Sequence, residues 1–358
     1  MKVLLIGRYN DTKSLTGPER FAKGMLNNLS EKTNVHFADY FYNGKEYSIF
    51  QKLFGYSIIN KNITRLGLFR LFFFILKFKP DVIHILNYER NAVIACFASK
   101  FFKTKLIYTS HGLIRYEDRL YNNPSFSLKL KNKFSEKYIL KSSDCIVFVS
   151  EFLEQLTLKE YKFLNKKFYI IPPGVDKNFY GREVSISHSD ILEIVTFEYH
   201  PSRLKGISTL ISVLNENDFN DFLSVLSDSK NIIVLNHKSI ILGKNDYSSY
   251  REFLKNKDVI VCLSEYDTFS LFTAEAMCSG LIPIVSEHTG IRDYITNVEN
   301  GFIINNFDKS ELKSVLQKIS TDKTLKNKMS SYAMNIYSEL NWDSVINRYF
   351  KIYNSKEL

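Results

Sequence analysis

The chain has little of several features that define special classes of protein. Its 358 residues include four cysteines, 7 prolines and 14 glycines. A composition so poor in glycine and proline, with 45% apolar residues, excludes disordered and fibrous chains and indicates a globular protein. The cysteines lie in apolar segments without metal-ligand spacing, so we expect reduced, buried thiols in a cytoplasmic protein. They are Cys96, Cys145, Cys262 and Cys278.

Long hydrophobic runs are also missing. The longest run, Leu71–Leu76, is flanked by Arg70 and Lys77 and is far shorter than the roughly 18 residues that a membrane-spanning helix needs. Residues 1–7 suggest a first strand rather than a signal peptide, because Arg8 follows too soon for a signal-peptide apolar core. Since no Asp-x-Asp pair occurs, we expect no metal ion.

Acidic residues are scarce in the first half. Residues 1–180 hold 29 Lys/Arg against 15 Asp/Glu, whereas the rest holds 19 against 23. A basic half suggests contact with an anionic surface, although general solubility and codon bias are an alternative explanation. No recognised nucleic-acid-binding fold accompanies the charge, so nucleic acid is not an expected partner.

Short β-rich runs alternate with helical patterns along the chain. This alternation predicts an α/β protein with parallel sheets covered by helices. Strands are expected at Val3–Ile6, Val82–Leu86, Leu106–Thr109, Cys145–Val149, Tyr169–Ile171, Ile194–Phe197, Ile232–Leu235, Val259–Leu263 and Ile282–Val285. Helices are expected at Glu19–Leu29, Ile63–Phe78, Ser127–Leu140, Lys309–Ser320 and Asp322–Leu340.

The strand–helix rhythm is interrupted once, at Pro172-Pro173-Gly174, and no strand follows for about twenty residues. A chain of this length favours two domains. We therefore predict two doubly wound, Rossmann-like domains facing a cleft, 1–180 and 181–340. A C-terminal helix, 341–358, is expected to pack back on the first domain.

The most informative segment runs from Asp258 to Gly290. A buried strand leads into a loop containing Asp267, a helix from Leu271 to Ser279 carries Glu275, and a second strand follows Gly280. Eight helical residues would place the two carboxylates roughly 12 Å apart. That separation does not suit the close acid pair of a retaining glycosidase. The two acids are therefore expected to contact different parts of one extended ligand.

Other polar residues follow predicted strands. Lys205-Gly206 comes after the strand Ile194–Phe197, and Ser110-His111-Gly112 comes after Leu106–Thr109. Gly17 precedes a predicted helix, within Thr16-Gly17-Pro18-Glu19-Arg20. Because ligands bind at the carboxyl edge of open parallel sheets, these positions are candidate site residues. His84, inside an apolar strand, is expected to be a satisfied core histidine.

Together these segments resemble the nucleotide-sugar glycosyltransferases of the GT-B fold, in particular the retaining family-4 group, or glycosyl transferases group 1. Asp267 and Glu275 match the spacing of the two family glutamates, with Ala276-Met277 and Gly280-Leu281-Ile282-Pro283 following. Two departures are an aspartate at 267 and Tyr199-His200 where the family has Gly-Arg. Arg203 or His200 is expected to replace the missing arginine.

The resemblance implies a retaining transfer without a metal or other cofactor, from a UDP- or GDP-type sugar donor. The acceptor would be a glycan or lipid-linked molecule in bacterial surface polysaccharide or glycoconjugate synthesis. Glu275 would bind the ribose diol, and the helix-start amides would bind the diphosphate. The expected catalytic residues are His111, Asp267 and Lys205; the expected donor-binding residues are Gly17, Arg203, His200, Thr268, Phe269, Ser270, Leu271, Glu275 and Thr289.

Other interpretations stay open at the level of the sequence. Glu275 could be a solvated surface acid, Lys205 a solvated turn residue and Gly17 an ordinary turn glycine. A sugar-nucleotide epimerase shares the expected architecture, and a non-catalytic scaffold is suggested by the lost Gly-Arg.

A basic, aromatic segment indicates peripheral contact with the inner face of the plasma membrane. Its cations are Lys61, Arg65, Arg70, Lys77 and Lys79, with a second cluster at Lys129, Lys131, Lys133, Lys137 and Lys141. An ordinary helix packed on the first sheet is the alternative, and the favoured one, for Phe72 to Leu76.

Overall fold

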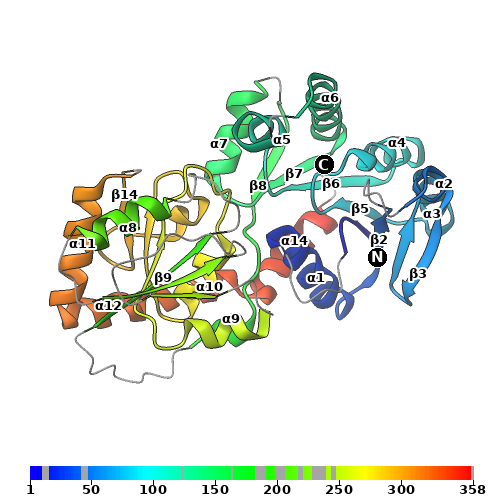
Figure 1. Ribbon diagram of the computed structural model, residues 1–358. Helices are drawn as coiled ribbons and strands as arrows, with labels where there is room; N and C mark the ends of the chain where they lie inside the picture. The colour runs from blue at the N-terminus through cyan, green and yellow to red at the C-terminus, as the bar shows by residue number, and fades with distance from the viewer. Residues whose placement is uncertain are drawn as a thin grey trace. The chain divides into compact units, whose positions relative to one another are not determined.

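The computed structural model describes residues 1–9, 16–41, 47–122, 124–162, 164–181, 191–198, 206–216, 221–227, 239–242, 247–305 and 307–355. The chain forms two compact units that divide at Pro173–Gly174 and Asn341–Trp342 (Figure 1). Unit 1 contains the N-terminal part and the segment from Trp342 onward, and unit 2 contains Gly174–Asn341.

Unit 1 is built on an eight-stranded sheet in the order β3-β4-β2-β1-β5-β6-β7-β8, in which only the β3–β4 pair is antiparallel. Its strands are β1 Lys2–Ile6, β2 Asn34–Tyr40, β3 Tyr56–Asn60, β4 Ile63–Leu66, β5 Val82–Ile85, β6 Lys105–Ser110, β7 Cys145–Phe148 and β8 Lys167–Ile170. Its α-helices are α1 Gly17–Ser30, α2 Ile49–Phe54, α3 Leu68–Phe78, α4 Val93–Phe102, α5 Ile114–Glu117, α6 Phe126–Ser142, α7 Glu151–Glu160 and α14 Trp342–Asn354.

Unit 2 is built on a six-stranded parallel sheet in the order β11-β10-β9-β12-β13-β14. Its strands are β9 Leu192–Glu198, β10 Asp221–Ser227, β11 Ser239–Leu242, β12 Val259–Cys262, β13 Ile282–Ser286 and β14 Phe302–Ile304. Its α-helices are α8 Ile207–Asn215, α9 Tyr247–Leu254, α10 Leu271–Cys278, α11 Lys309–Thr321, α12 Lys323–Met334 and α13 Tyr337–Leu340. The predicted α/β class with parallel sheets is confirmed.

Both faces of the central strands of the unit 1 sheet are buried. Val3 and Leu5 of β1 pack in one core cluster with Phe21 of α1 and Tyr349 of α14. Leu4, which points to the opposite face because strand side chains alternate, has no exposed surface either. Burial on both faces explains why the strands are continuous apolar runs. The C-terminal helix α14 packs against α1 within this unit.

Two predicted helices are wrong in part. Residues 63–66 form β4, because the β-branched Ile63 and Thr64 pair with Phe37 and Ala38 of β2, and only Leu68–Phe78 is helical. The predicted helix Asp322–Leu340 is two helices, α12 and α13, separated at Asn335–Ile336. Strands β2, β3, β10, β11 and β14 were not predicted, and Ile232–Leu235 lies outside the described residues.

The start of α8 lies against the end of β12. Gly206, the N-cap residue of α8, has φ +66°, and a Cβ added there would lie 2.5 Å from the carbonyl oxygen of Leu263. Glycine is therefore required both by the left-handed backbone and by the close approach to the strand. This contact brings the helix start to the carboxyl edge of the sheet.

Replacing Gly206 by alanine should destabilise unit 2. We expect Gly206→Ala to lower the free energy of unfolding by about 2–4 kcal/mol, since it combines positive-φ strain with overpacking. Gly181 is the matched control, with φ +94° and no described atom within 4 Å of an added Cβ. Gly181→Ala should cost about 1–2 kcal/mol, from backbone strain alone. Urea denaturation followed by circular dichroism measures both; equal losses would contradict the close-approach argument.

Candidate functional site

The loop between β12 and α10 lies at the carboxyl edge of the unit 2 sheet. β12 pairs with β9 on one side and with β13 on the other, so the ends of three parallel strands meet there. Ser270, the N-cap residue of α10, is a non-glycine residue with φ +67°. Its hydroxyl bonds the hydroxyl of Thr273 at 2.8 Å. Strained backbone of this kind is concentrated at functional sites, which supports a functional role for the loop.

Asp267 and Thr289 lie side by side in the structure. The amide of Asp267 donates to the carbonyl of His288 at 3.1 Å, and the amide of Gly290 donates to the carbonyl of Asp267 at 2.8 Å. The Asp267 carboxylate also accepts the amide of Phe269 at 3.3 Å. The loop after β12 is thereby tied to the loop after β13. Two candidate residues that are far apart in sequence become neighbours.

Hydroxyl groups reinforce the same junction. The Ser286 hydroxyl donates to the carbonyl of Ser264 and bonds the Thr289 hydroxyl at 3.1 Å. All three residues are fully buried. The backbone between the two loops is therefore held by buried hydrogen bonds, which are costly to break.

Glu275 is enclosed by protein. Its side chain is only 1% exposed, and its helix neighbours Thr273, Ala274, Ala276 and Met277 are buried as well. The interpretation of Glu275 as a solvated surface acid is therefore wrong. A buried carboxylate needs specific partners to offset its desolvation, so Glu275 is a stronger candidate for a binding role than an exposed acid would be.

Two helix starts lie at this edge, those of α8 and α10. The first backbone N–H groups of a helix have no partner within it, and the helix dipole is positive at that end. Such ends bind anionic groups such as phosphates. The predicted cationic residues Lys205, Arg203 and His200 lie outside the described residues.

Aromatic packing holds the start of α10. Phe272, in its first turn, stacks on Phe197 of β9 with ring centroids 5.2 Å apart. Tyr250 of α9 contacts Phe272 edge-on at 4.7 Å, and its hydroxyl donates to the Phe272 carbonyl at 3.0 Å. These residues were not predicted. The available signal was a phenylalanine near the end of the predicted strand, Phe197, and one at the start of the predicted helix, Phe272.

His111 follows β6 in unit 1. Its ring packs on Phe21 of α1, with centroids 4.5 Å apart and planes at 61°. Burial lowers the pKa of His111 to about 3, because desolvation disfavours the imidazolium. His111 is therefore neutral near pH 7, and it can donate one hydrogen bond without carrying a charge.

Gly17 begins α1, the helix that also carries Phe21. The preceding residue, Thr16, donates from its amide and its hydroxyl to the Glu19 carboxylate, at 2.8 and 2.9 Å. A Cβ added at Gly17 would meet nothing within 4 Å. Among the described residues, no close packing requires glycine at this position.

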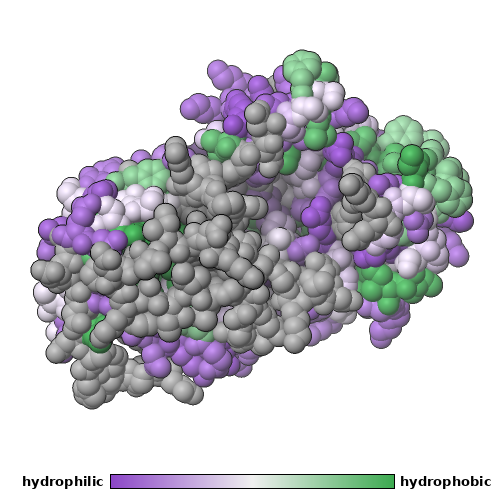
Figure 2. All heavy atoms as spheres, viewed as in Figure 1, coloured by the Kyte–Doolittle hydropathy of each residue, from purple (hydrophilic) through white to green (hydrophobic). Residues whose placement is uncertain are grey.

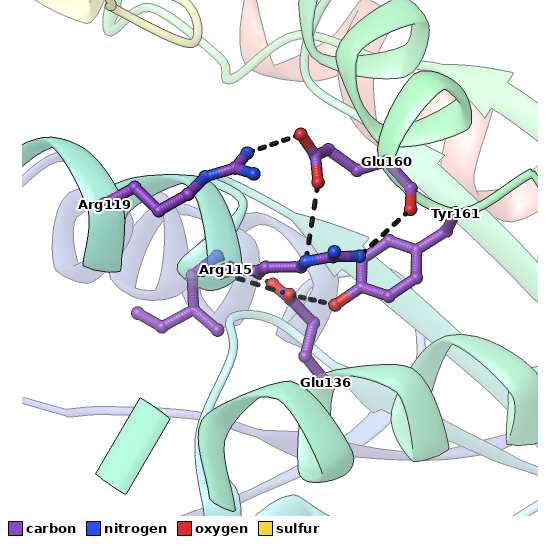
Figure 3. Close-up of polar contacts among 6 residues, drawn as sticks. Arg115, Arg119, Glu136, Glu160 and Tyr161 are labelled. Atoms are coloured by element: carbon purple, nitrogen blue, oxygen red, sulfur yellow. Dashed lines mark hydrogen bonds and ion pairs between the residues drawn. The ribbon is translucent and has the colours of Figure 1, made fainter. Parts of the chain in front are cut away.

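Glu136 of α6 holds the start of α5, the short helix that follows His111 (Figure 3). Its carboxylate accepts the amides of Ile114 and Arg115 at 2.7 and 3.2 Å, and the Tyr161 hydroxyl at 2.6 Å. Burial raises the pKa of Glu136 to about 7, against the lowering effect of these hydrogen bonds. Glu136 was not predicted. Its signal was that it is the one acid in the lysine-rich segment 126–142.

A second, partly exposed carboxylate flanks α5. Glu160 at the end of α7 forms ion pairs with Arg115, at 3.5 Å, and with Arg119 (Figure 3). The Arg115 guanidinium also lies over the Tyr161 ring, 5.6 Å from its centroid. Together with Glu136, these contacts fix residues 114–119 to α6 and α7.

His84 lies in the core of unit 1 and is not part of the candidate site. Its ring nitrogens bond the Tyr353 hydroxyl and the Thr109 hydroxyl, each at 2.7 Å, and its side chain is fully buried. The prediction of a satisfied core histidine is confirmed.

Within the described ranges, no group of three or more His, Cys, Asp or Glu side chains could hold a metal ion. The helices in those ranges include none that is long and apolar enough to cross a membrane.

Comparisons with known proteins match both units. The family described as Glycosyl transferases group 1 matches residues 205–336, and Glycosyltransferase Family 4 matches residues 16–179. N-acetyl-alpha-D-glucosaminyl L-malate synthase of Bacillus anthracis is 22% identical over 294 residues, covering 76% of this chain and 74% of the relative.

Two solved structures are similar over nearly the whole chain. Sucrose-phosphate synthase of Thermosynechococcus elongatus has a TM-score of 0.75 at 16% identity, covering 98% of both chains. HepE of Anabaena, solved in complex with UDP, has a TM-score of 0.75 at 13% identity, covering 98% of this chain and 99% of its own. With two family matches in chain order and this fold, the chain belongs to the glycosyl transferases group 1, which are GT-B glycosyltransferases.

Proposed function

We propose that this glycosyltransferase moves a sugar from a nucleotide-diphosphate donor to a glycan or lipid-linked acceptor, with retention of anomeric configuration. The observation that carries the proposal is the buried Glu275 on a helix whose start adjoins the tied Asp267–Thr289 junction. These groups lie at one edge of the sheet, where the carboxylate can bind the ribose and the helix start can bind the diphosphate. The polar loop can contact the sugar.

Each part of the donor has a proposed partner. Glu275 accepts hydrogen bonds from the ribose diol. The amides of Phe269 to Leu271 and the start of α8 bind the diphosphate. Lys205, with Arg203 or His200, offsets the negative charge that develops on the leaving diphosphate, so that no metal ion is needed. Asp267, Thr268 and Thr289 contact the sugar.

We assign binding of the acceptor to unit 1. His111, neutral as its lowered pKa requires, donates a hydrogen bond to the transferred sugar, and Gly17 leaves room at the start of α1. The bond from the anomeric carbon to the diphosphate oxygen breaks, and the bond to the acceptor oxygen forms on the same face. The acceptor proton passes to the leaving diphosphate. No enzymic nucleophile is required in this mechanism.

UDP is the first donor nucleotide to test, with GDP as the alternative, because HepE was solved with UDP. Bacterial surface polysaccharide or glycoconjugate synthesis is the proposed pathway. The basic N-terminal half supports a peripheral position on an anionic membrane surface.

The reaction can be tested by the stereochemistry of its product. We expect a panel of UDP and GDP sugars, incubated with glycan acceptors and a metal chelator, to yield a product with the donor's anomeric configuration by proton NMR. Inversion would contradict the retaining mechanism. A nucleotide-sugar isomer formed without acceptor would instead indicate an epimerase, and binding without turnover a scaffold.

Glu275 can be tested by calorimetry with the nucleotide that binds. Loss of charged hydrogen bonds to a diol costs about 2–4 kcal/mol, so we expect Glu275→Ala and Glu275→Gln to weaken binding by roughly 30- to 1,000-fold. Glu252→Ala, at an ion-paired but exposed position on α9, is the control. Unchanged affinity in both Glu275 variants, with intact thermal unfolding, would overturn the assignment.

Glu136 should make stability depend on pH. Its pKa in the folded protein, about 7, is raised above the unfolded value, so the folded state binds the proton more tightly. The contribution of Glu136 to the free energy of unfolding is therefore fully present below pH 4.5, and it is lost as the pH rises through 7 and the folded protein gives up the proton. We expect the wild type to lose about 2 kcal/mol relative to Glu136→Gln between pH 5 and pH 8.

Urea denaturation at several pH values measures this difference. Glu31→Gln, at an exposed position of the same unit, controls for a change of charge alone. A constant difference between the wild type and Glu136→Gln across this pH range would contradict the raised pKa.

A further inference from the structure

Unit 1 exposes an unusual number of large aromatic side chains on three neighbouring helices. α3 buries only Leu71 and Ile75. The expectation of an ordinary packed helix for Phe72 to Leu76 is therefore right for Ile75 and wrong for Phe73 and Leu76. The exposed fractions of six phenylalanines range from 43% to 71%. These residues, which we call the phenylalanine face, are Phe50 and Phe54 of α2, Phe69 and Phe73 of α3, and Phe97 and Phe101 of α4.

The phenylalanine face is continuous. Phe54 contacts Phe50 at 5.4 Å and stacks on Phe69 at 5.0 Å, which joins α2 to α3. Phe72, half-buried beneath the face, contacts Phe97 at 6.1 Å and Phe101 at 6.0 Å, which joins α3 to α4.

The apolar surface can be followed on the molecule. Figure 2 shows apolar side chains gathered where Figure 1 labels α2, α3 and β3. Ile58 of β3 is also 63% exposed. Apolar patches of such extent on proteins in water mark interaction sites.

Charge identifies the partner. Residues 47–80 contain six Lys/Arg and no Asp or Glu, although one of the six, Arg65, is neutralised by the buried Asp39 of β2 at 2.7 Å. α4 ends at Lys100 and Lys103 without an acid. In an isologous dimer through this face, the cations of one copy would meet those of the other without carboxylates to pair with. A bilayer with anionic headgroups complements both the phenylalanines and their cationic surroundings.

We infer that the phenylalanine face inserts into the headgroup region of an anionic lipid bilayer, with the surrounding Lys and Arg side chains on the lipid phosphates. Arg70 and Lys77, both exposed on α3, flank the aromatic run and are placed to bind the headgroups. Lys52 of α2 and Lys100 of α4 provide the same charge on the neighbouring helices. This inference names the membrane contact of the proposed function, but it does not depend on the donor.

Co-sedimentation with vesicles tests the inference. The full-length chain should bind phosphatidylcholine vesicles that contain phosphatidylglycerol, and bind pure phosphatidylcholine weakly. Phe69→Ser, Phe73→Ser and Phe101→Ser combined should reduce binding by about a hundredfold, since aromatic burial is lost. Tyr332→Ser, at an exposed position on α12 of unit 2, should bind like the wild type. Arg70→Gln with Lys77→Gln should remove part of the salt dependence.

Insertion can be observed directly. Phe73→Trp should be quenched by doxyl-labelled lipid, whereas Tyr332→Trp should not; the natural Trp342 is buried against α1 and provides a constant background. No wild-type binding to anionic vesicles, equal binding by the triple variant, or equal quenching at both sites would overturn the inference.

Size-exclusion chromatography with light scattering tests whether a second copy of the chain, rather than a bilayer, covers the phenylalanine face. A wild-type dimer that the triple variant abolishes would assign the face to a second copy and overturn the membrane contact. Nucleotide binding by the triple variant should equal that of the wild type, so failure of vesicle binding is distinguishable from failure of the proposed function.

Discussion

The parallel pairing of β12 with β9 and β13 is the interaction on which the candidate site depends. Parallel strands end at one edge, so the residues after each strand meet there although they are distant in sequence. The register of Val259 with Ile194 and Ile282 brings Leu263, Ser286 and the start of α8 together. Hydrogen bonds between Asp267 and residues 288–290 then fix the two loops.

Buried polar groups have different uses in the two units. His84 is satisfied by two hydroxyl groups and stabilises the core. Glu136 uses its carboxylate to hold the start of α5, the helix that follows His111. Glu275 is buried within α10, where a charge is costly unless specific partners offset its desolvation. Burial alone therefore does not distinguish a structural from a catalytic group; the identity of the partners does.

Much of the fold could be predicted because strands buried on both faces are short apolar runs with helices between them. The central strands β1, β5, β6, β7, β9, β12 and β13 were predicted on that basis. Residues 63–66 were predicted wrongly, because an apolar run next to a helix does not reveal whether it pairs with β2. Asp267 and Glu275 could be selected by spacing, whereas Glu136 could not, because its partners at 114, 115 and 161 are not local.

The amino-acid sequence by itself determined the α/β class and the family, because hydrophobic periodicity and motif spacing are local properties of the chain. It also determined the excess of cations over residues 47–80. Only the tertiary structure decided that Asp267 adjoins Thr289, that Glu275 is buried and that Gly206 lies against Leu263. It likewise decided which phenylalanines enter the core and which stay on the surface. Those outcomes depend on contacts between distant segments, which no local pattern encodes.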